Sequence, residues 1–252
     1  MKTMSFFNEK GGSGKSTFTL MMASWLRYKC GARVAVFDLD APMFSISELR
    51  AADLEAYSSG NRELMKFLSE GCDPRSDWYP IETAPVDGMG RQDQDDMASY
   101  ILSYEDELDY VFIDFGGSFI EGDTVVSFLR RRILDLVIIP VYTDPTVLLS
   151  AMELLHRTTS MGQRSCVFWN RVTRSERPQK ERNRLEPLSA LLRREGAHVL
   201  KTLIPDLTIF RRDSRTWRFV RTTACWPQSN VDIMCPSLEG LFSEIKTEID
   251  SI

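Results

Sequence analysis

The sequence has few cysteines and no long apolar run. Its five cysteines are odd in number, widely scattered and never in a C-x-x-C spacing, which argues against a disulfide framework and against a zinc site. No run of about 18 or more apolar residues is present to span a bilayer. The N-terminus leads into a glycine-rich loop rather than a cleavage site, and there is no internal repeat or low-complexity tract. We therefore expect a cytoplasmic protein with reduced thiols.

The charges of the 252 residues are distributed unevenly around a net charge of −5. Residues 1–156 carry 14 Lys and Arg against 25 Asp and Glu, whereas residues 157–221 carry 16 against 6. The later block is either a surface that faces a polyanion or a solvated face whose charges happen to cluster. Composition alone favours neither interpretation.

The hydrophobic pattern predicts the fold class. With 43% apolar residues the chain can bury a sizeable core, and we expect a single domain over residues 1–252. Short apolar runs alternate with longer amphipathic ones, which is typical of an α/β fold of three layers, a mostly parallel twisted sheet with helices on both faces. Strands are predicted at residues 3–7, 33–38, 110–114, 136–141, 166–170 and 197–204, and helices at residues 15–28, 63–69, 145–159, 178–195 and 237–249.

Residues 71–96 interrupt this alternation. They are rich in Asp, Pro and Gly and include Trp78 and Tyr79. Because such a composition favours turns, we expect a surface excursion between the second and third core strands.

A glycine-rich loop joins the first predicted strand to the first predicted helix. The ordinary pattern G-x-x-x-x-G-K-[ST] fails, because Glu9 stands where its first glycine belongs, and residues 10–16 fit K-G-G-x-G-K-[ST] instead. Gly11, Gly12 and Gly14 allow positive φ and close approach of the backbone. The successive backbone N–H groups of the loop, including the N–H of Ser13, can then converge on the β-phosphate of a nucleotide.

The residues at the end of this loop complete a nucleotide site. Lys15 can reach the β- and γ-phosphate oxygens, Ser16 can give its hydroxyl to Mg²⁺, and Thr17 can contact the α-phosphate. The alternative is a glycine turn that binds nothing. The setting between a strand and a helix at the N-terminus argues against it.

The loop resembles that of the ParA/MinD group of deviant Walker P-loop ATPases, which includes plasmid and chromosome partition ATPases. The resemblance implies that Lys10 crosses a dimer interface to the partner's nucleotide, so that ATP holds a homodimer together. It implies ATP and Mg²⁺ as cofactors, with Lys10 and Lys15 stabilising the transferred phosphoryl group. It also implies slow hydrolysis without a partner such as a ParB-like adaptor.

Two carboxylates close the second predicted strand. Alternation along the strand places Asp38 and Asp40 on the same side of the chain, and they resemble the D-x-D-P motif of the family. The resemblance assigns Asp38 to the metal and Asp40 to the attacking water. Ala41 before Pro42, and Met43 where a polar residue is common, depart from the family and put switch behaviour after the proline in doubt. The alternative is a pair of acids that end a strand and cap a turn.

A third carboxylate, Asp114, ends the third long apolar strand and is followed by Gly116 and Gly117. An acid at the carboxyl end of a buried strand beside the phosphate strand can hold Mg²⁺ through water. The glycines would bring the backbone near the γ-phosphate. An Asp at the end of a strand is common and by itself weak evidence for a metal site. Its occurrence together with the glycine-rich loop makes the prediction strong.

Two further pairs resemble the base-binding residues of the family. Asn170 and Arg171 resemble an N-R pair whose amide reads the adenine edge, for which a side chain with both donor and acceptor is suited. Pro205 and Asp206 match a loop that flanks the base. Simple turn residues are the alternative for both pairs.

The basic block contains two candidate polyanion-binding patches. In partition ATPases a basic region near the first of these patches, which is defined below, binds DNA without sequence preference once the dimer has formed. Contacts with phosphates would make this binding salt-dependent. A solvated helix face is the alternative. The first patch is Arg211, Arg212, Arg215 and Arg218, and the second is Arg171, Arg174, Arg177, Lys180, Arg182 and Arg184.

The predicted C-terminal helix tests for a membrane-binding tail. From Leu238 to Asp250 it carries one lysine and four acids, so anionic lipid would repel it. Its apolar stripe, at positions 238, 241, 242, 245 and 249, therefore predicts core packing and no membrane partner.

Together these features favour an ATP-dependent dimer that acts in plasmid, chromosome or mobile-element DNA partition and associates with the nucleoid through DNA. A metabolic or metal-cluster ATPase of the same superfamily is disfavoured because paired cluster-type cysteines are lacking. A nucleotide-gated scaffold for a conjugation or secretion machine, with no direct DNA binding, remains open.

Overall fold

The computed structural model describes residues 1–40, 43–65, 68, 76–83, 91–116, 124–173, 178–206, 223–224 and 237–252. Their centre is a sheet of seven strands in the order β3-β2-β4-β1-β5-β6-β7, in which every neighbouring pair is parallel. The strands are β1 (Lys2–Phe6), β2 (Val34–Leu39), β3 (Ile81–Thr83), β4 (Tyr110–Phe115), β5 (Leu136–Val141), β6 (Ser165–Val172) and β7 (His198–Pro205).

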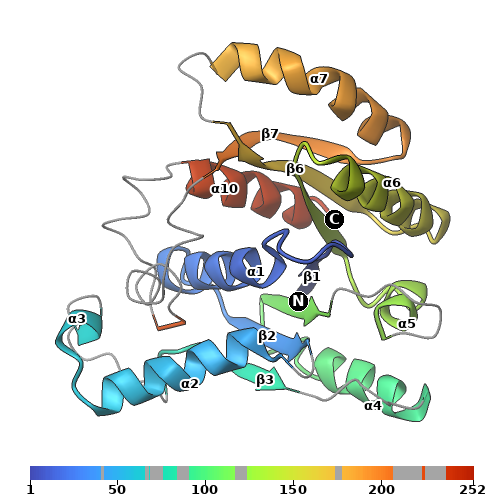
Figure 1. Ribbon diagram of the computed structural model, residues 1–252. Helices are drawn as coiled ribbons and strands as arrows, with labels where there is room; N and C mark the ends of the chain where they lie inside the picture. The colour runs from blue at the N-terminus through green and yellow to red at the C-terminus, as the bar shows by residue number, and fades with distance from the viewer. Residues whose placement is uncertain are drawn as a thin grey trace.

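Helices cover both faces of the sheet (Figure 1). One core contains side chains of α1, α2 and α10, and the other contains side chains of α4, α5, α6 and α7. The three-layer α/β prediction is therefore confirmed. The helices are α1 (Lys15–Ser24), continued by the π-helical segment η1 (Trp25–Lys29), α2 (Ser45–Ser58), α3 (Arg62–Met65), α4 (Arg91–Leu102), α5 (Thr124–Arg130), α6 (Pro145–Ser160), α7 (Pro178–Arg194) and α10 (Ser237–Asp250).

The central strands are largely apolar because both faces of the sheet are covered. All six residues of β4 and of β5 are buried. Neighbouring residues serve opposite faces, as Phe6 belongs to the core beside α1 and Phe7 to the core beside α6. All six predicted strands are present, each with ends within two residues of those expected.

The surface excursion predicted at residues 71–96 is wrong for its described middle part. Trp78 and Tyr79 are buried, and β3 then pairs with β2 as the edge strand. The Tyr79 hydroxyl is 3.1 Å from Oγ of Ser24, and the Arg50 guanidinium lies 5.1 Å from the centroid of the Tyr79 ring. The aromatic residues therefore attach this segment to α1 and α2.

The C-terminal helix packs as predicted. The five apolar residues of its stripe, Leu238, Leu241, Phe242, Ile245 and Ile249, are fully buried in the core beside α1. Among the helices that the structure describes, none is long and apolar enough to cross a bilayer.

Candidate nucleotide-binding site

The glycine-rich loop leaves the carboxyl end of β1 and enters α1 at Lys15. Gly12 and Gly14 have φ values of 71° and 100°, in the region that favours glycine. A Cβ atom on Gly14 would lie 3.0 Å from the Phe18 ring, so both the conformation and the space exclude a larger residue. Because the strands are parallel, the predicted carboxylates at the ends of β2 and β4 lie at the same edge of the sheet.

Asn8 holds the start of the loop, although no sequence motif predicted this role. This residue is fully buried, and its Nδ2 donates to the carbonyl of Pro140 in β5 at 3.0 Å. Its Oδ1 accepts a hydrogen bond from the backbone N–H of Lys10 at 3.0 Å. Asn side chains often bond the backbone two residues on, so a polar amide directly after an apolar strand was the available signal.

The end of β6 holds the other side of the loop. Nδ2 of Asn170 donates to the carbonyl of Ser13 at 3.0 Å, and Nη2 of Arg171 donates to the carbonyl of Gly12. Both residues therefore contact the backbone of the loop. Their hydrogen bonds go to the loop backbone, and Oδ1 of Asn170 accepts from the N–H of Arg171 at 2.8 Å, so base recognition by Asn170 stays a prediction.

Lys15 and Asp114 form the charged centre of the site. Burial lowers the pKa of Lys15, and the negative charges of Asp114 and Asp40 oppose that change. Asp114 is fully buried, and burial raises its pKa to about 7, with further upward contributions from Asp38 and Asp40. The Ser16 hydroxyl and Lys15 act in the opposite direction on this pKa.

The buried carboxylate of Asp114 fits a divalent cation. Neither of its oxygens makes a hydrogen bond of normal geometry in the described part of the chain, although the Ser16 hydroxyl lies near enough to lower its pKa. A buried carboxylate without well-formed hydrogen bonds is costly unless a cation compensates it. Within the described residues no group of three or more His, Cys, Asp or Glu side chains is gathered for a metal. Mg²⁺, however, commonly binds through one or two carboxylates and keeps its waters. Asp114 and the Ser16 hydroxyl are therefore the best candidates to hold it.

Asp38 has a structural role, similar to the alternative of an acid that ends a strand and caps a turn. Its Oδ2 accepts hydrogen bonds from the N–H groups of Ile46 and Ser47 at 3.1 and 2.9 Å and from the Ser47 hydroxyl at 3.0 Å. A carboxylate at the start of a helix satisfies free N–H groups and interacts favourably with the helix dipole. Asp38 thus anchors the start of α2, and its contact with a metal stays a prediction.

Asp40 lies over the end of β4. Its Oδ1 is 3.1 Å from the position that a Cβ atom on Gly116 would take, so the glycine leaves room for the carboxylate. Asp38 and Asp114 are directly paired in the sheet register. The three predicted carboxylates therefore lie at the same end of neighbouring strands without forming a metal-binding cluster. Ala41, Pro42 and Gly117 lie outside the described residues.

The remaining predicted residues are only partly described. The N–H of Asp206 donates to the carbonyl of Val172 at 2.8 Å, which places Pro205 and Asp206 beside the end of β6. Thr17 is half-buried in the first turn of α1. The first basic patch, Arg211, Arg212, Arg215 and Arg218, lies outside the described residues, as do Arg174 and Arg177 of the second.

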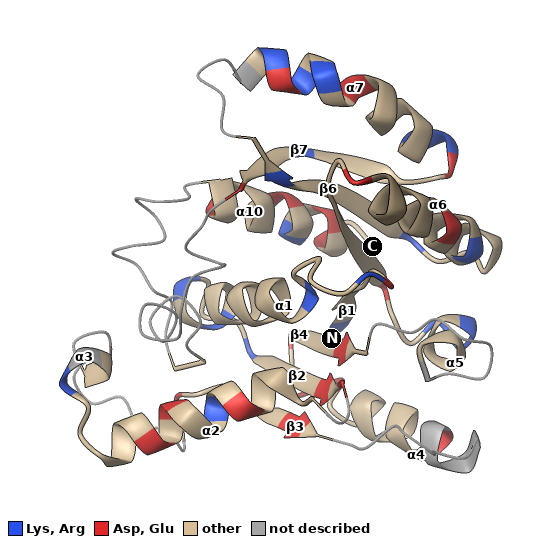
Figure 2. Ribbon diagram, in the orientation of Figure 1, with Lys and Arg blue, Asp and Glu red and all other residues tan. Residues whose placement is uncertain are grey.

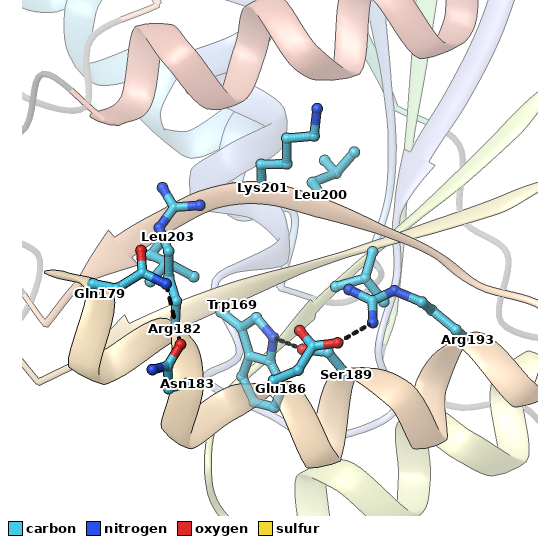
Figure 3. Close-up of a pocket in the computed structure, with 11 residues that line it drawn as sticks. Trp169, Gln179, Arg182, Asn183, Glu186, Ser189, Arg193, Leu200, Lys201 and Leu203 are labelled. Carbon is cyan, nitrogen blue, oxygen red and sulfur yellow. Dashed lines mark hydrogen bonds and ion pairs between the residues drawn. The ribbon is translucent and has the colours of Figure 1, made fainter.

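Apart from Arg171 at the end of β6, the described residues of the second patch lie on α7. Acidic and basic residues alternate along this helix (Figure 2), and Arg184 pairs with Glu181 at 2.9 Å. Arg182 lines a cavity of about 380 Å³ between α7 and the strands β6 and β7. In this cavity Glu186 pairs with Arg193 at 2.6 Å (Figure 3). This face of α7 is therefore of mixed charge rather than uniformly basic.

Comparison with known proteins agrees with this geometry. The CbiA family, described as the CobQ/CobB/MinD/ParA nucleotide binding domain, matches residues 4–216. The chain belongs to this family. No curated protein matches the sequence of this CbiA-family chain. The predicted relationship to ParA and MinD is confirmed.

Solved structures share the fold of this CbiA-family protein. The cell division ATPase MinD of Pyrococcus furiosus is 18% identical, with a TM-score of 0.62 and 98% of each chain covered. The pNOB8 ParA is 18% identical, with a TM-score of 0.59, and 99% of this chain and 98% of that chain are covered. The septum site-determining protein MinD of Pyrococcus horikoshii, complexed with Mg-ADP, is 16% identical, with a TM-score of 0.59 and coverage of 97% and 95%.

Proposed function

We propose that this protein is a Mg²⁺-dependent ATPase that hydrolyses ATP slowly and acts as a molecular switch by dimerising on ATP. The observation that carries the proposal is the buried, unpartnered carboxylate of Asp114 beside Lys15 and Ser16, at the end of a glycine loop. The solved MinD complex with Mg-ADP supports the choice of nucleotide and metal. ATP and Mg²⁺ are the cofactors proposed.

Each residue of the site has a role that follows from its position. The N–H groups of residues 11–17 cradle the phosphates at the positive end of α1, and Lys15 neutralises the phosphoryl oxygens as a point charge. Ser16 and Asp114 would hold Mg²⁺, which would supply electrostatic stabilisation of the phosphates. Asp40 would orient the attacking water, since its carboxylate lies at the neighbouring strand end.

Lys10 is the residue that links nucleotide binding to dimerisation. It is exposed beside the loop, where its ammonium group can reach a second nucleotide across an interface. A cation supplied by the partner stabilises the charge that develops in phosphoryl transfer. ATP would then hold two copies of the chain together, and hydrolysis would release them.

Gel filtration with ATP and with ADP tests this switch. Asp40→Ala should bind MgATP, fail to hydrolyse it and elute as a dimer with ATP only. Lys10→Ala should bind ATP as a monomer, and Lys15→Ala should lose binding. Asp106→Ala, an exposed acid at the opposite edge of the sheet, is the matched control and should behave as the wild type. A monomer under all conditions would overturn the sandwich dimer.

For the cellular role we propose DNA partition, with the dimer binding DNA non-specifically through Arg211, Arg212, Arg215 and Arg218 and with a ParB-like adaptor as activator. The basic block and the ParA relative support this role. The second candidate is the nucleotide-gated scaffold, which the complex of MinD with MinC from Aquifex aeolicus supports as an example of a partner-binding relative.

Binding of random-sequence duplex DNA at several salt concentrations separates these roles. Replacement of Arg211, Arg215 and Arg218 by Ala should abolish ATP-dependent retention while ATP binding is preserved. Replacement of Lys180, Arg182 and Arg184 on α7 removes as many charges from the second patch and serves as the control. Each phosphate contact contributes about 0.9 to the log–log salt slope. No retention of the wild type at low salt would favour the scaffold.

A further inference from the structure

Two consecutive carbonyl groups of the phosphate loop are held by side chains at the end of β6. The carbonyl of Gly12 accepts from Nη2 of Arg171, and that of Ser13 accepts from Nδ2 of Asn170 at 3.0 Å. A loop whose N–H groups converge on a phosphate points its carbonyls to the opposite side, where side chains or water must satisfy them. The two side chains supply these partners.

Arg171 reaches the loop from an uncommon backbone conformation. Its φ is 51°, in the left-handed region that residues other than glycine avoid. Two contacts hold it there. Its N–H donates to Oδ1 of Asn170 at 2.8 Å, and its guanidinium lies over the Tyr142 ring, with 4.8 Å between Cζ and the ring centroid.

Tyr142 directs the guanidinium toward the loop. It follows β5 directly, and β5 lies between β1 and β6 in the sheet, so Tyr142 stands at the end of the strand that separates the loop-bearing strand from β6. Stacking on an aromatic face restricts a planar guanidinium and leaves its N–H groups free to donate at the edge. The geometry thus aims Arg171 at the carbonyl of Gly12.

We propose that Arg171, held by Tyr142, is a positioning residue for the phosphate loop. By fixing the carbonyl of Gly12 it orients the neighbouring N–H groups toward the phosphates before the nucleotide binds. Such preorganisation improves affinity because less order has to be imposed on binding. The inference rests on the proposed function, since it matters only if the loop binds a polyphosphate. Arg171 would thus act on the loop backbone, which is a role separate from recognition of the adenine base.

Binding of MgATP and of magnesium tripolyphosphate to the full chain tests the inference, because tripolyphosphate carries no base. Both ligands can be measured by displacement of a fluorescent ATP labelled on the ribose. Arg171→Ala and Tyr142→Leu should each weaken both ligands by the same factor, about tenfold for the loss of one charge-assisted hydrogen bond. Tyr142→Phe keeps the ring and should bind as the wild type.

The double variant Arg171→Ala/Tyr142→Leu supplies a readout that a merely structural role would not move. Because Tyr142 acts through Arg171, the double variant should bind no more weakly than Arg171→Ala alone. Thermal unfolding without ligand checks the fold of each variant. If Arg171→Ala does not fold, the comparison of Tyr142→Leu with Tyr142→Phe carries the test.

Three outcomes would overturn the inference. These are unchanged affinity of the folded variants, a loss confined to ATP with tripolyphosphate unaffected, or additive losses in the double variant. The loss confined to ATP would instead assign Arg171 to the base. A wild type that binds neither ligand would overturn the proposed function and this inference with it, whereas wild-type binding with an indifferent Arg171→Ala would overturn the inference alone.

Discussion

Asp53 accepts two hydrogen bonds from Thr223, from its N–H at 2.6 Å and from its hydroxyl at 2.8 Å, although 170 positions separate the two residues. Arg50 donates to the same hydroxyl at 2.8 Å, and the Tyr28 hydroxyl donates to the Thr223 carbonyl at 2.7 Å. Thr223 is fully buried. Helix α2, whose first turn is anchored by Asp38, therefore also holds a point of the chain between β7 and α10.

This anchor predicts a stability effect. Asp53→Ala leaves the buried N–H of Thr223 without this acceptor, so the free energy of unfolding should fall by about 1–3 kcal/mol. Urea denaturation measures it. Glu55→Ala removes an exposed acid from the same helix and should change stability little. Equal transition midpoints for the two variants would show that the hydrogen bonds to Thr223 contribute nothing net.

Gly14→Ala should weaken nucleotide binding without preventing folding. The new methyl group would lie 3.0 Å from the Phe18 ring, and the alanine would have to adopt a φ of 100°. We therefore expect the start of α1 and its N–H groups to shift. We expect MgATP affinity to fall by at least about tenfold, the equivalent of roughly 1.4 kcal/mol. Gly60→Ala also has a positive φ but meets nothing within 4 Å. It should lose some stability while its affinity stays that of the wild type.

The raised pKa of Asp114 predicts how stability depends on pH without metal. An unfolded Asp ionises near pH 4, whereas the folded carboxyl has a pKa of about 7. Between these values the folded state binds more protons, so the stability contributed by this residue is present at low pH and is lost as the pH rises toward 7. Asp114→Asn, which does not ionise, should therefore become the more stable protein at pH 8, by up to about 4 kcal/mol.

Urea midpoints at pH 5, 6, 7 and 8 measure this difference. The exposed Asp106→Asn is the control, and its profile should run parallel to that of the wild type. Parallel profiles for Asp114→Asn as well would contradict the raised pKa.

Asp38 offers a way to separate anchoring from metal binding. Asp38→Ala removes the acceptor for the N–H groups of Ile46 and Ser47, so without metal the free energy of unfolding should fall by about 1–3 kcal/mol. Ser47→Ala removes only the hydroxyl contact and should cost less. If Asp38 served the metal alone, the free energy of unfolding of Asp38→Ala would differ from that of the wild type only when Mg²⁺ and nucleotide are present.

The sequence predicted the core strands because their signal is local. The six residues of β5 form one apolar run, and the structure begins and ends that strand where the pattern does. Helix α2 was not predicted, since only Ile46 and Asp53 are buried along it, which leaves no apolar periodicity to read. Strand β3 has three residues, none of them fully buried, and its pairing with β2 is visible only in three dimensions.

The same distinction applies to the site. The glycines and Lys15 were identified because their chemistry lies in one short segment. The partners of the loop backbone were not, since Asn170 meets Ser13 across 157 positions and Asn8 meets Pro140 across 132. Any side chain with an N–H or O–H donor can bond a backbone carbonyl, so such a contact places little constraint on the identity of the residue that supplies it. Sequence spacing therefore predicts which groups can do chemistry better than which groups hold them.

The strand order has a consequence for where any ligand can bind. From β1 the chain moves outward through β2 to β3 on one side, returns to β4, and then crosses to β5, β6 and β7 on the other side. The direction in which successive strands are added to the sheet thus reverses around β1. The connections that leave neighbouring strands in opposite directions at such a topological switch point leave a crevice beyond the carboxyl ends of the strands. The location of the phosphate loop is therefore already set by chain connectivity, and the glycines adapt that crevice to phosphate.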